Sequence, residues 1–212
     1  AILEKESMSG DTIMPLFIDS RYTVDIDSQS DWIKYQRLVL EGNLEMVDPG
    51  PHKRPFPQKV ELLVMDFDGV LTDNRVWVDE QGHESVASNR SDSLGLNNLR
   101  AQTKVQTLVI SKEVNLVVTA RCSKIKLECL QAVDDKPALL AKVMKERGID
   151  PEHVIYMGND TNDLPCFPLV GYAVAPADAH PEVLLGVDHV TSLSGGRGAV
   201  RELCDLILDK VK

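Results

Sequence analysis

Two carboxylates separated by a single residue, Asp66 and Asp68, are the clearest sign of chemistry in this sequence of 212 residues. They follow residues 60–65, a short apolar and β-branched run typical of a strand buried on both faces of a parallel sheet. Open α/β sheets bind their ligands just beyond the carboxyl ends of such strands. Two like charges so close together are unfavourable unless a cation or a shared proton relieves the repulsion. The pair therefore indicates a metal-dependent catalytic site; an ordinary turn built from Asp68 and Gly69 is the alternative.

Such a pair of carboxylates has a specific chemistry. One attacks an electrophile and forms a covalent intermediate, while the other protonates the leaving group and later activates water. A Mg²⁺ ion reduces the repulsion between a carboxylate and an incoming phosphate. The stretch Asp-Phe-Asp-Gly-Val-Leu-Thr-Asp at 66–73 resembles the first motif of the haloacid dehalogenase superfamily of phosphatases. The resemblance implies that Asp66 is the nucleophile, that Asp68 is the general acid and base, and that Asp66 and the Asp68 carbonyl bind Mg²⁺.

Ser111 directly follows the second expected strand. A hydroxyl there can donate to a phosphate oxygen, although serine is also a common helix cap. The Ser-Lys-Glu stretch that begins at Ser111, with the helix after it, resembles the second motif in the branch of the superfamily that acts on 2-keto-3-deoxy sugar acids. The resemblance implies that Ser111 holds the phosphoryl group and that Glu113, Arg121 and Lys124 bind the sugar acid. Arg121 and Lys124 are three residues apart and therefore share a helix face. The alternative is that this face is simply exposed to solvent.

Lys136 stands at the start of a helix expected over 138–146, where the helix dipole favours acidic residues instead. An unfavourable placement of this kind suggests a function. The third motif of the same superfamily is a lysine at this location, which implies that Lys136 binds the phosphoryl group and offsets the charge of the nucleophile.

The stretch Gly-Asn-Asp-Thr-Asn-Asp after residues 154–157 resembles the fourth motif of the superfamily, which supplies metal ligands. The first acidic position of that motif is occupied here by Asn159. An amide oxygen ligates Mg²⁺ without contributing charge, so we expect weaker metal binding. Asp160 and Asp163 are expected to compensate, either as ligands or by orienting the ligands.

A Gly-Gly-Arg-Gly stretch at 195–198 leads into a closing helix expected to reach residue 211. Alone, such a stretch is usually a flexible turn. With the Ala-Val-Arg-Glu after it, it resembles the tail of the same sugar-acid branch, which lies near a neighbouring subunit's site. The chain between Asp66 and Ser111 has room for a hairpin and one helix but no large cap domain, and members without a cap build their lid from neighbouring subunits. The resemblance thus implies a homotetramer in which Arg197 completes the site of an adjacent subunit.

The expected elements indicate an α/β fold with a doubly wound parallel sheet, the Rossmann-like arrangement of the haloacid dehalogenase superfamily. Further strands are expected at 105–110, 170–174 and 187–191. Alternating apolar and polar residues over 74–88, around a turn that ends at Gly82, predict a β-hairpin flap. The helix after this hairpin starts near Asn89 and Asp92, which are both candidates for binding substrate.

The first 58 residues differ from the rest of the chain. Residues 48–58 are expected to form a linker, because their prolines are incompatible with a helix or a central strand. The Asp-Ile-Asp pattern at 25–27 resembles the closing motif of the acylneuraminate (CMP-sialic acid) cytidylyltransferases. The resemblance implies that residues 1–47 are the C-terminal remnant of such a domain, followed by a phosphatase domain at 59–212. The alternative for the remnant is a surface helix over 31–40 capped by a serine at 28 or 30.

The formal net charge of −10 argues against nucleic acid and against an anionic membrane surface as the main partner. A phosphorylated substrate is still compatible with this charge, because a metal ion and a few local cations can offset the overall negative field. The sequence contains neither a signal peptide nor an apolar run long enough to cross a membrane. Its four cysteines lack the spacing of a metal site and are interpreted as reduced thiols, which predicts a cytoplasmic location.

These features predict a Mg²⁺-dependent phosphomonoesterase that acts through an aspartyl-phosphate intermediate. The expected substrate is a 2-keto-3-deoxy sugar acid phosphate, either 3-deoxy-octulosonate 8-phosphate or a nonulosonate (sialic acid) 9-phosphate. The alternative is a non-catalytic or weakly active module that tetramerises a CMP-sialic acid synthetase. The presence of Asp66, Asp68, Ser111 and Lys136 favours the enzyme, since a scaffold requires none of them.

Overall fold

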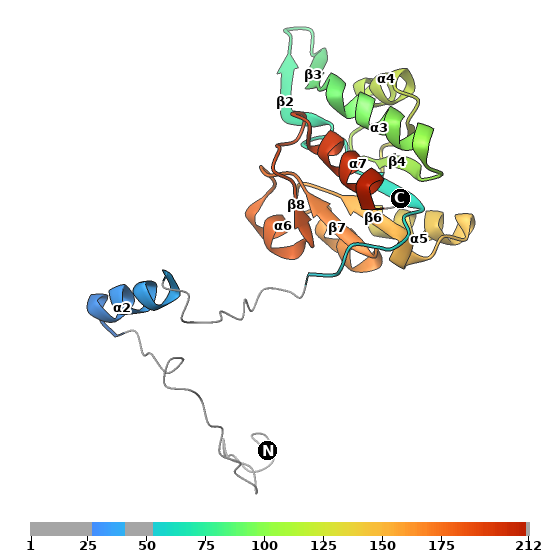
Figure 1. Cartoon of the computed structure of the whole chain (residues 1–212). Coiled ribbons are helices and arrows are strands. Elements are labelled where there is room, and N and C mark those ends of the chain that lie inside the picture. Colours follow the sequence, from blue (N-terminus) through green and yellow to red (C-terminus); the bar gives the residue numbers. More distant parts are fainter. Residues whose placement is uncertain (1–26, 41–52, 211–212) are drawn as a thin grey trace, which may run out of the picture. The chain divides into compact units, whose positions relative to one another are not determined.

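The computed structural model describes residues 27–40 and 53–210. The chain divides into two units, Ala1–Pro49 and Gly50–Lys212, and each is described by itself (Figure 1). In the first unit, α2 (Gln29–Leu40) confirms the helix expected over 31–40. Ser28 Oγ accepts a hydrogen bond from the Asp31 N–H at 3.3 Å, as an N-cap does. Of the Asp-Ile-Asp pattern at 25–27, only the last residue lies within the described ranges.

The second unit is built on a six-stranded parallel sheet with the order β5-β4-β1-β6-β7-β8. The strands are β1 (Leu62–Met65), β4 (Gln106–Ile110), β5 (Glu128–Leu130), β6 (Val154–Met157), β7 (Tyr172–Ala175) and β8 (His189–Val190). From β1 the chain runs outward through β4 to β5, then crosses back and runs outward on the other side. The doubly wound sheet is therefore confirmed, with β5 as a strand that the sequence did not predict.

Helices cover both faces of this sheet (Figure 1). One face carries α3 (Arg90–Gln102), α4 (Leu116–Lys124) and α7 (Ala199–Lys210). The other carries α5 (Lys136–Arg147) and α6 (Pro181–Gly186), with the short 3₁₀ helix η3 (Leu164–Leu169); another, η2 (Pro151–His153), precedes β6. No helix in the described ranges combines the length and apolar character needed to cross a membrane.

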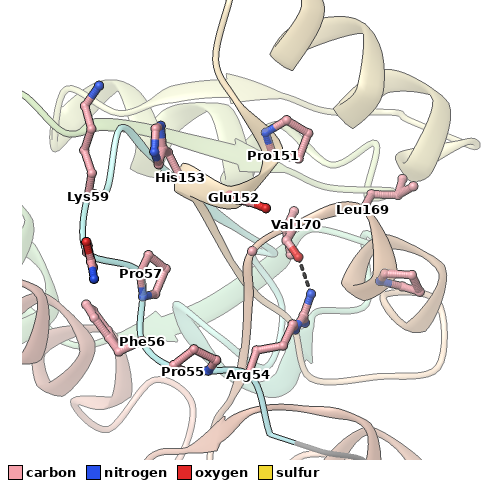
Figure 2. Close-up of a pocket in the computed structure, with 13 residues that line it drawn as sticks. Arg54, Pro55, Phe56, Pro57, Lys59, Pro151, Glu152, His153, Leu169 and Val170 are labelled. Carbon is pink, nitrogen blue, oxygen red and sulfur yellow. Dashed lines mark hydrogen bonds between the residues drawn. The ribbon is translucent and has the colours of Figure 1, made fainter.

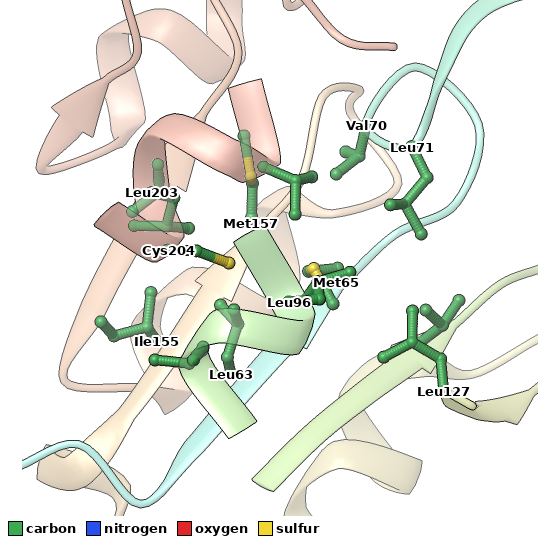
Figure 3. Close-up of a cluster of buried hydrophobic side chains, with 14 of the residues drawn as sticks. Leu63, Met65, Val70, Leu71, Leu96, Leu127, Ile155, Met157, Leu203 and Cys204 are labelled. Atoms are coloured by element: carbon green, nitrogen blue, oxygen red, sulfur yellow. The ribbon is translucent and has the colours of Figure 1, made fainter. Parts of the chain in front are cut away.

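The two faces of the sheet form two separate cores because successive side chains of a strand point in opposite directions. Leu63 and Met65 of β1 belong to the core beneath α3 and α7, shown in Figure 3, whereas Leu62 and Val64 belong to the core beneath α5. All four side chains are fully buried. Burial of each contributes about 1.5–3 kcal/mol, which fixes β1 and thereby the residues that follow it.

A two-stranded antiparallel hairpin, β2 (Thr72–Val78) and β3 (Glu84–Ser88), follows β1. It confirms the expected flap. Only this hairpin and α3 stand between β1 and β4, so there is no large cap domain. Val76, Trp77 and Val78 of the hairpin are exposed.

Residues 53–58, the second half of the expected linker, are bound to the body of the domain (Figure 2). Arg54 donates four hydrogen bonds to Asp188, among them Nε to Oδ1 at 3.1 Å and Nη2 to Oδ2 at 2.7 Å, and it also donates to backbone carbonyls. Phe56 packs edge-on against Tyr172 with 5.1 Å between ring centroids. Residues 53–58 of the expected linker therefore pack on the domain. A cavity of about 630 Å³ lies beneath them, at the amino ends of β6 and β7.

Candidate active site

The polar candidates gather where the chain reverses its direction across the sheet. Met65 at the end of β1 pairs with Val109 of β4 on one side and with Met157 of β6 on the other. The residues after these three strands therefore meet at one edge, the place where open α/β sheets bind ligands. This register brings the first, second and fourth motifs together.

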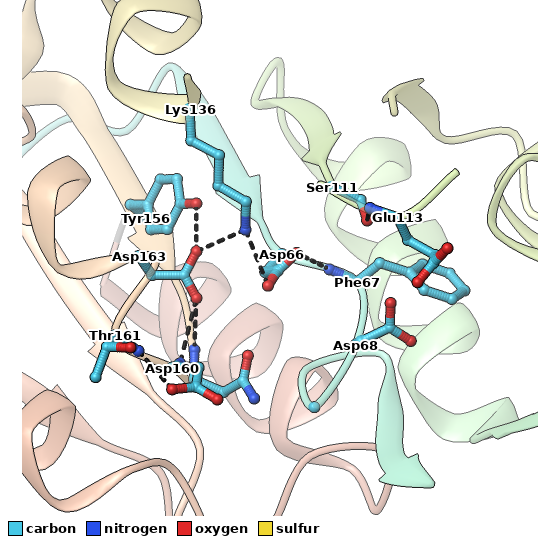
Figure 4. A network of polar contacts seen from close by, with 12 residues as sticks. Asp66, Phe67, Asp68, Ser111, Glu113, Lys136, Tyr156, Asp160, Thr161 and Asp163 are labelled. Atoms are coloured by element: carbon cyan, nitrogen blue, oxygen red, sulfur yellow. Dashed lines mark hydrogen bonds and ion pairs between the residues drawn. The ribbon is translucent and has the colours of Figure 1, made fainter. Parts of the chain in front are cut away.

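A buried lysine joins the first motif to the third and fourth (Figure 4). Lys136 Nζ lies 2.9 Å from Asp66 Oδ2 and 2.8 Å from Asp163 Oδ1. Phe67 N–H donates to the other Asp66 oxygen at 2.7 Å. Lys136 and Asp163 are almost inaccessible to solvent, and Asp66 is 6% exposed. The expected association of Asp66 with Lys136 is therefore present in the fold.

Burial and neighbouring charges together set the pKa values of these groups. Burial raises the pKa of Asp66 to about 7; repulsion from Asp163 acts in the same direction and the Lys136 charge opposes both. For Lys136 burial alone would lower the pKa, but attraction to the two carboxylates more than offsets it and the pKa is raised. The pKa of Asp68 is raised by burial and by the nearby charge of Glu113. A raised pKa suits a carboxyl group that must hold a proton near neutrality.

Asp68 is oriented by a residue that sequence reasoning did not single out. Thr72 is fully buried, and its Oγ1 lies 3.4 Å from Asp68 Oδ1. The same hydroxyl oxygen accepts a hydrogen bond from Gly69 N–H at 3.2 Å, which closes the turn after the first motif. The sequence signal for this role is a polar residue, Thr72, directly after the apolar pair Val70 and Leu71 of the first motif.

Asp163 holds the fourth-motif loop from within. Its Oδ1 accepts from Lys136 Nζ and, at 2.8 Å, from the Tyr156 hydroxyl. Its Oδ2 accepts from the backbone N–H groups of Asn159 at 3.0 Å and Asp160 at 3.4 Å. Because each of its oxygens already accepts from two donors, we assign Asp163 to positioning this loop, not to direct metal contact.

Asn159 supplies the observation that bears on a metal. Its Oδ1 is buried and has no hydrogen-bond partner, as expected of an oxygen that faces a cation. The Asn159 side chain lies against Gly69, where a Cβ would come within 1.9 Å of Nδ2. Gly69 also has φ +75°, a conformation that favours glycine. The two loops are therefore packed directly on each other.

Within residues 27–40 and 53–210 no three Asp, Glu, His or Cys side chains converge as metal ligands. The expected set differs from such a cluster, because it includes the Asn159 amide and the Asp68 carbonyl. Asp160 has one oxygen bonded to the Thr161 N–H. The Asn159 amide oxygen has no hydrogen-bond partner, and the Asp160 carboxylate follows it in the sequence. This combination fits a hard divalent cation, which prefers oxygen ligands.

Ser111 and Glu113 lie beside Phe67 and Asp68 in Figure 4. Ser111 is 1% exposed, and its Oγ accepts from the Glu113 N–H at 3.0 Å. One Glu113 oxygen accepts from the two backbone N–H groups that follow it and so supports the approach to α4. Both residues thus lie near the first-motif stretch.

Asn89 and Asp92, which are predicted to bind substrate, both make hydrogen bonds within the protein. Asn89 caps α3, and its side chain accepts from Ser91 N–H at 2.9 Å. Asp92 is 1% exposed and accepts from the Arg201 N–H at 2.9 Å, which joins α3 to the start of α7. These two side chains build helix ends, because a polar residue at a helix start satisfies free N–H groups.

Arg121 also binds protein groups: it donates to Ser93 Oγ at 2.7 Å and to the Asn89 carbonyl at 3.3 Å. Its Nε is buried without a hydrogen-bond partner. Lys124 is exposed at the end of α4. Arg197 is exposed and lies 3.7 Å from Asp73 of its own chain. Roles of these three cations in recognition remain predictions.

Comparison with known proteins agrees with this geometry. Residues 94–203 match the family model of haloacid dehalogenase-like hydrolases. The chain is 35% identical over 159 residues to the 3-deoxy-D-manno-octulosonate 8-phosphate phosphatase KdsC of Salmonella typhimurium, covering 74% of this chain and 84% of that protein. The chain belongs to the haloacid dehalogenase-like hydrolases. It is a phosphatase of that family.

Solved structures of the family superpose on the same part of the chain. A Streptomyces avermitilis protein assigned to the HAD family of hydrolases is 44% identical, with a TM-score of 0.70 over 73% of this chain and 88% of that one. The 3-deoxy-D-manno-octulosonate 8-phosphate phosphatase of Moraxella catarrhalis, solved with a magnesium ion, a phosphate ion and a KDO molecule, is 31% identical. Its TM-score is 0.68 over 71% of this chain and 87% of that one.

Proposed function

We propose that this phosphatase is Mg²⁺-dependent and removes phosphate from an eight- or nine-carbon 2-keto-3-deoxy sugar acid through an aspartyl-phosphate intermediate. The observation that carries the proposal is the buried contact of Lys136 Nζ with Asp66 Oδ2 at 2.9 Å, directly after β1. It places a cation beside the proposed nucleophile at the ligand-binding edge of the sheet.

In the first step an Asp66 oxygen attacks phosphorus, and the bond from phosphorus to the sugar oxygen breaks. Asp68 gives its proton to that leaving oxygen, a role for which its raised pKa is suited. In the second step water attacks the phosphorus of the aspartyl-phosphate and gives its proton to Asp68. Inorganic phosphate leaves, and the Asp66 carboxylate is restored.

Lys136 and Ser111 are proposed to hold the phosphoryl oxygens. An ammonium group has three N–H donors, and two of those of Lys136 point to Asp66 and Asp163. The third is left for a phosphoryl oxygen. Asp66, the Asp68 carbonyl, Asn159 and Asp160 would hold Mg²⁺, which would supply positive charge to offset that of the transferring group.

Glu113, Arg121 and Lys124 are proposed to recognise the sugar acid, and Arg197 to complete the site of an adjacent subunit in a homotetramer. The support for the shared site is the small hairpin lid with its exposed Val76, Trp77 and Val78. A cytoplasmic location is proposed because all four cysteines are free thiols.

Residues 1–47 are proposed to end a cytidylyltransferase-like domain. The support is the Asp-Ile-Asp pattern at 25–27 and the division of the chain near residue 49.

A phosphate-release screen with Mg²⁺ tests the proposal. Eight- and nine-carbon 2-keto-3-deoxy sugar acid phosphates should be hydrolysed with a higher kcat/KM than matched aldose phosphates that lack the carboxylate. Equal rates for both classes would contradict the sugar-acid substrate, and no release from any of them would contradict the proposed reaction.

A further inference from the structure

The Tyr156 hydroxyl is a buried polar group that the mechanism above does not use. Tyr156 lies within β6, in the apolar run Val-Ile-Tyr-Met, and is fully buried. Its ring packs edge-on against Phe167 with 6.0 Å between ring centroids. Its hydroxyl donates to Asp163 Oδ1 at 2.8 Å (Figure 4). Packing would be equally served by phenylalanine, so the hydroxyl needs a separate reason.

Asp163 Oδ1 is shared between two donors of different kinds. Lys136 Nζ approaches it at 2.8 Å and is also 2.9 Å from Asp66 Oδ2. One ammonium group thus serves two carboxylates in a buried site, where an unpaired charge is costly. The Tyr156 hydroxyl stabilises the Asp163 carboxylate with a neutral donor, which leaves the ammonium group free to contact Asp66 as well.

We infer that Tyr156 is a positioning residue: through Asp163 it keeps Lys136 directed at Asp66 and keeps the Asn159–Asp160 loop in place for Mg²⁺. Without the hydroxyl, Asp163 Oδ1 has a single donor and draws the ammonium group toward itself. The Asp163 carboxylate, no longer held by the tyrosine, can then rotate. This rotation loosens the contacts of Asp163 Oδ2 with the Asn159 and Asp160 N–H groups, at 3.0 and 3.4 Å. This inference rests on the roles proposed above for Asp66 and Lys136.

Tyr156→Phe tests the inference because it removes one oxygen and retains the ring. Tyr172→Phe is the matched control: Tyr172 is a buried tyrosine on the neighbouring strand β7, packed on Phe56 and outside the Asp163 network. Mutation of a residue that orients metal ligands typically lowers metal affinity or activity by about 10–100-fold. We expect Tyr156→Phe to lower kcat by about tenfold and to weaken Mg²⁺ binding, measured by calorimetry without substrate, by about the same factor.

The two measurements separate positioning from packing. A purely structural role lowers the melting temperature of both variants while kcat and the Mg²⁺ dissociation constant of the folded protein stay at the wild-type values, and that result overturns the inference. The proposed function fails in a different way, namely when wild-type protein releases no phosphate. KM should change little, because the affected contact of Lys136 with Asp66 matters mainly in the transition state.

The wild-type protein provides a second test should Tyr156→Phe fail to fold. A buried, hydrogen-bonded hydroxyl proton exchanges slowly and gives its own proton resonance. That resonance should shift when Mg²⁺ is added, whereas a resonance unaffected by Mg²⁺ overturns the inference.

Discussion

Lys136 carries its charge at the first turn of α5, where the free N–H groups of a helix disfavour a cation. It is also 1% exposed. Both conditions oppose the charged form, and the contacts with Asp66 and Asp163 at 2.9 and 2.8 Å reverse their effect. The charge is therefore held by partners and not by solvent, which makes its position depend on each of them.

At the scale of one residue, Asp66→Asn should reduce turnover by about 10⁴-fold or more, because an amide oxygen is a poor nucleophile. The amide avoids burial of a charge, so the fold should be retained and the melting temperature should not fall. Phosphate release and thermal unfolding measure the two effects. Substantial activity in a purified Asp66→Asn protein would mean that another residue attacks phosphorus.

Asn159→Asp tests the expected metal ligand whose Oδ1 has no hydrogen-bond partner. A carboxylate adds a charge at that oxygen, so Mg²⁺ binding should strengthen by about tenfold. Without Mg²⁺ the variant should be less stable than wild type, since a further buried charge then lacks a counterion. Calorimetric titration with Mg²⁺ measures the affinity, and an unchanged dissociation constant would remove residue 159 from the ligand set.

At the scale of elements, the joint between α3 and α7 depends on Asp92. Burial raises its pKa to about 6, while the Arg201 N–H and the charge of Arg121 oppose the shift. The ordinary value is 3.8, so the folded state holds the proton more tightly than the unfolded state. The stabilising contribution of this group is complete below about pH 4 and is lost as the pH rises through about 6.

Asp92→Asn should therefore raise the melting temperature at pH 7.5, by about 2–4 °C for each kcal/mol gained, and leave it unchanged at pH 4.5. The amide resembles the protonated acid, which explains the pH difference. Thermal unfolding at the two pH values measures it. KM for the substrate should not change, because this side chain lies between helices; a large rise in KM would restore Asp92 to substrate binding.

The strands that bear the motifs were predictable because each apolar run is followed directly by polar residues. The run that ends at Met65, for example, is followed by Asp66. The three-residue strand β5 was not, since Glu128, Cys129 and Leu130 form no distinct pattern. Its place is set by pairing with β4. Such a tertiary cause is invisible in the local sequence.

The same reasoning explains which structural roles were missed in the sequence. Tyr156 is one polar atom in an apolar strand, and its sequence context is that of a core residue. Asn89 and Asp92 stand at a helix start, where a cap and a ligand require the same residue types. Only the direction of the side chain distinguishes the two roles, and that direction follows from how α3 packs on α7.

At the scale of the whole domain, Arg54 ties the segment before β1 to the far edge of the sheet. Its partner Asp188 is buried and also accepts from the Ala173 N–H at 2.7 Å. Arg54→Met should lower the free energy of unfolding by about 2 kcal/mol, less than for a fully buried pair because the Arg54 side chain is 35% exposed.

Denaturant unfolding measures this loss. Lys142→Met is its control, since the exposed Lys142–Glu146 pair spans 3.8 Å and should contribute less than about 0.5 kcal/mol. Equal effects of the two variants would mean that the Arg54–Asp188 pair stabilises the domain no more than an exposed ion pair does.

The proposed sharing of sites between subunits makes a prediction for mixed assemblies. Asp66→Asn and Arg197→Ala protomers, each impaired alone, should recover part of the activity when they are mixed and reassembled, because some sites then combine intact contributions. Phosphate release from the mixture measures the recovery. A chain that is monomeric at assay concentration and fully active would exclude a shared site.

The side chain of Asn159 fills the space that a side chain at position 69 would need, so the two loops share this space. A side chain at 69 would overlap Nδ2 of Asn159, at 1.9 Å from the new Cβ, so a substitution at position 69 requires the Asn159 side chain to move or to become smaller. Either change would displace or remove the amide oxygen proposed to bind the metal. In evolutionary terms the two positions are coupled: a side chain gained at position 69 would disturb the proposed metal ligand at position 159. Drift in either loop is thereby limited by the other, although 90 residues separate them in the chain.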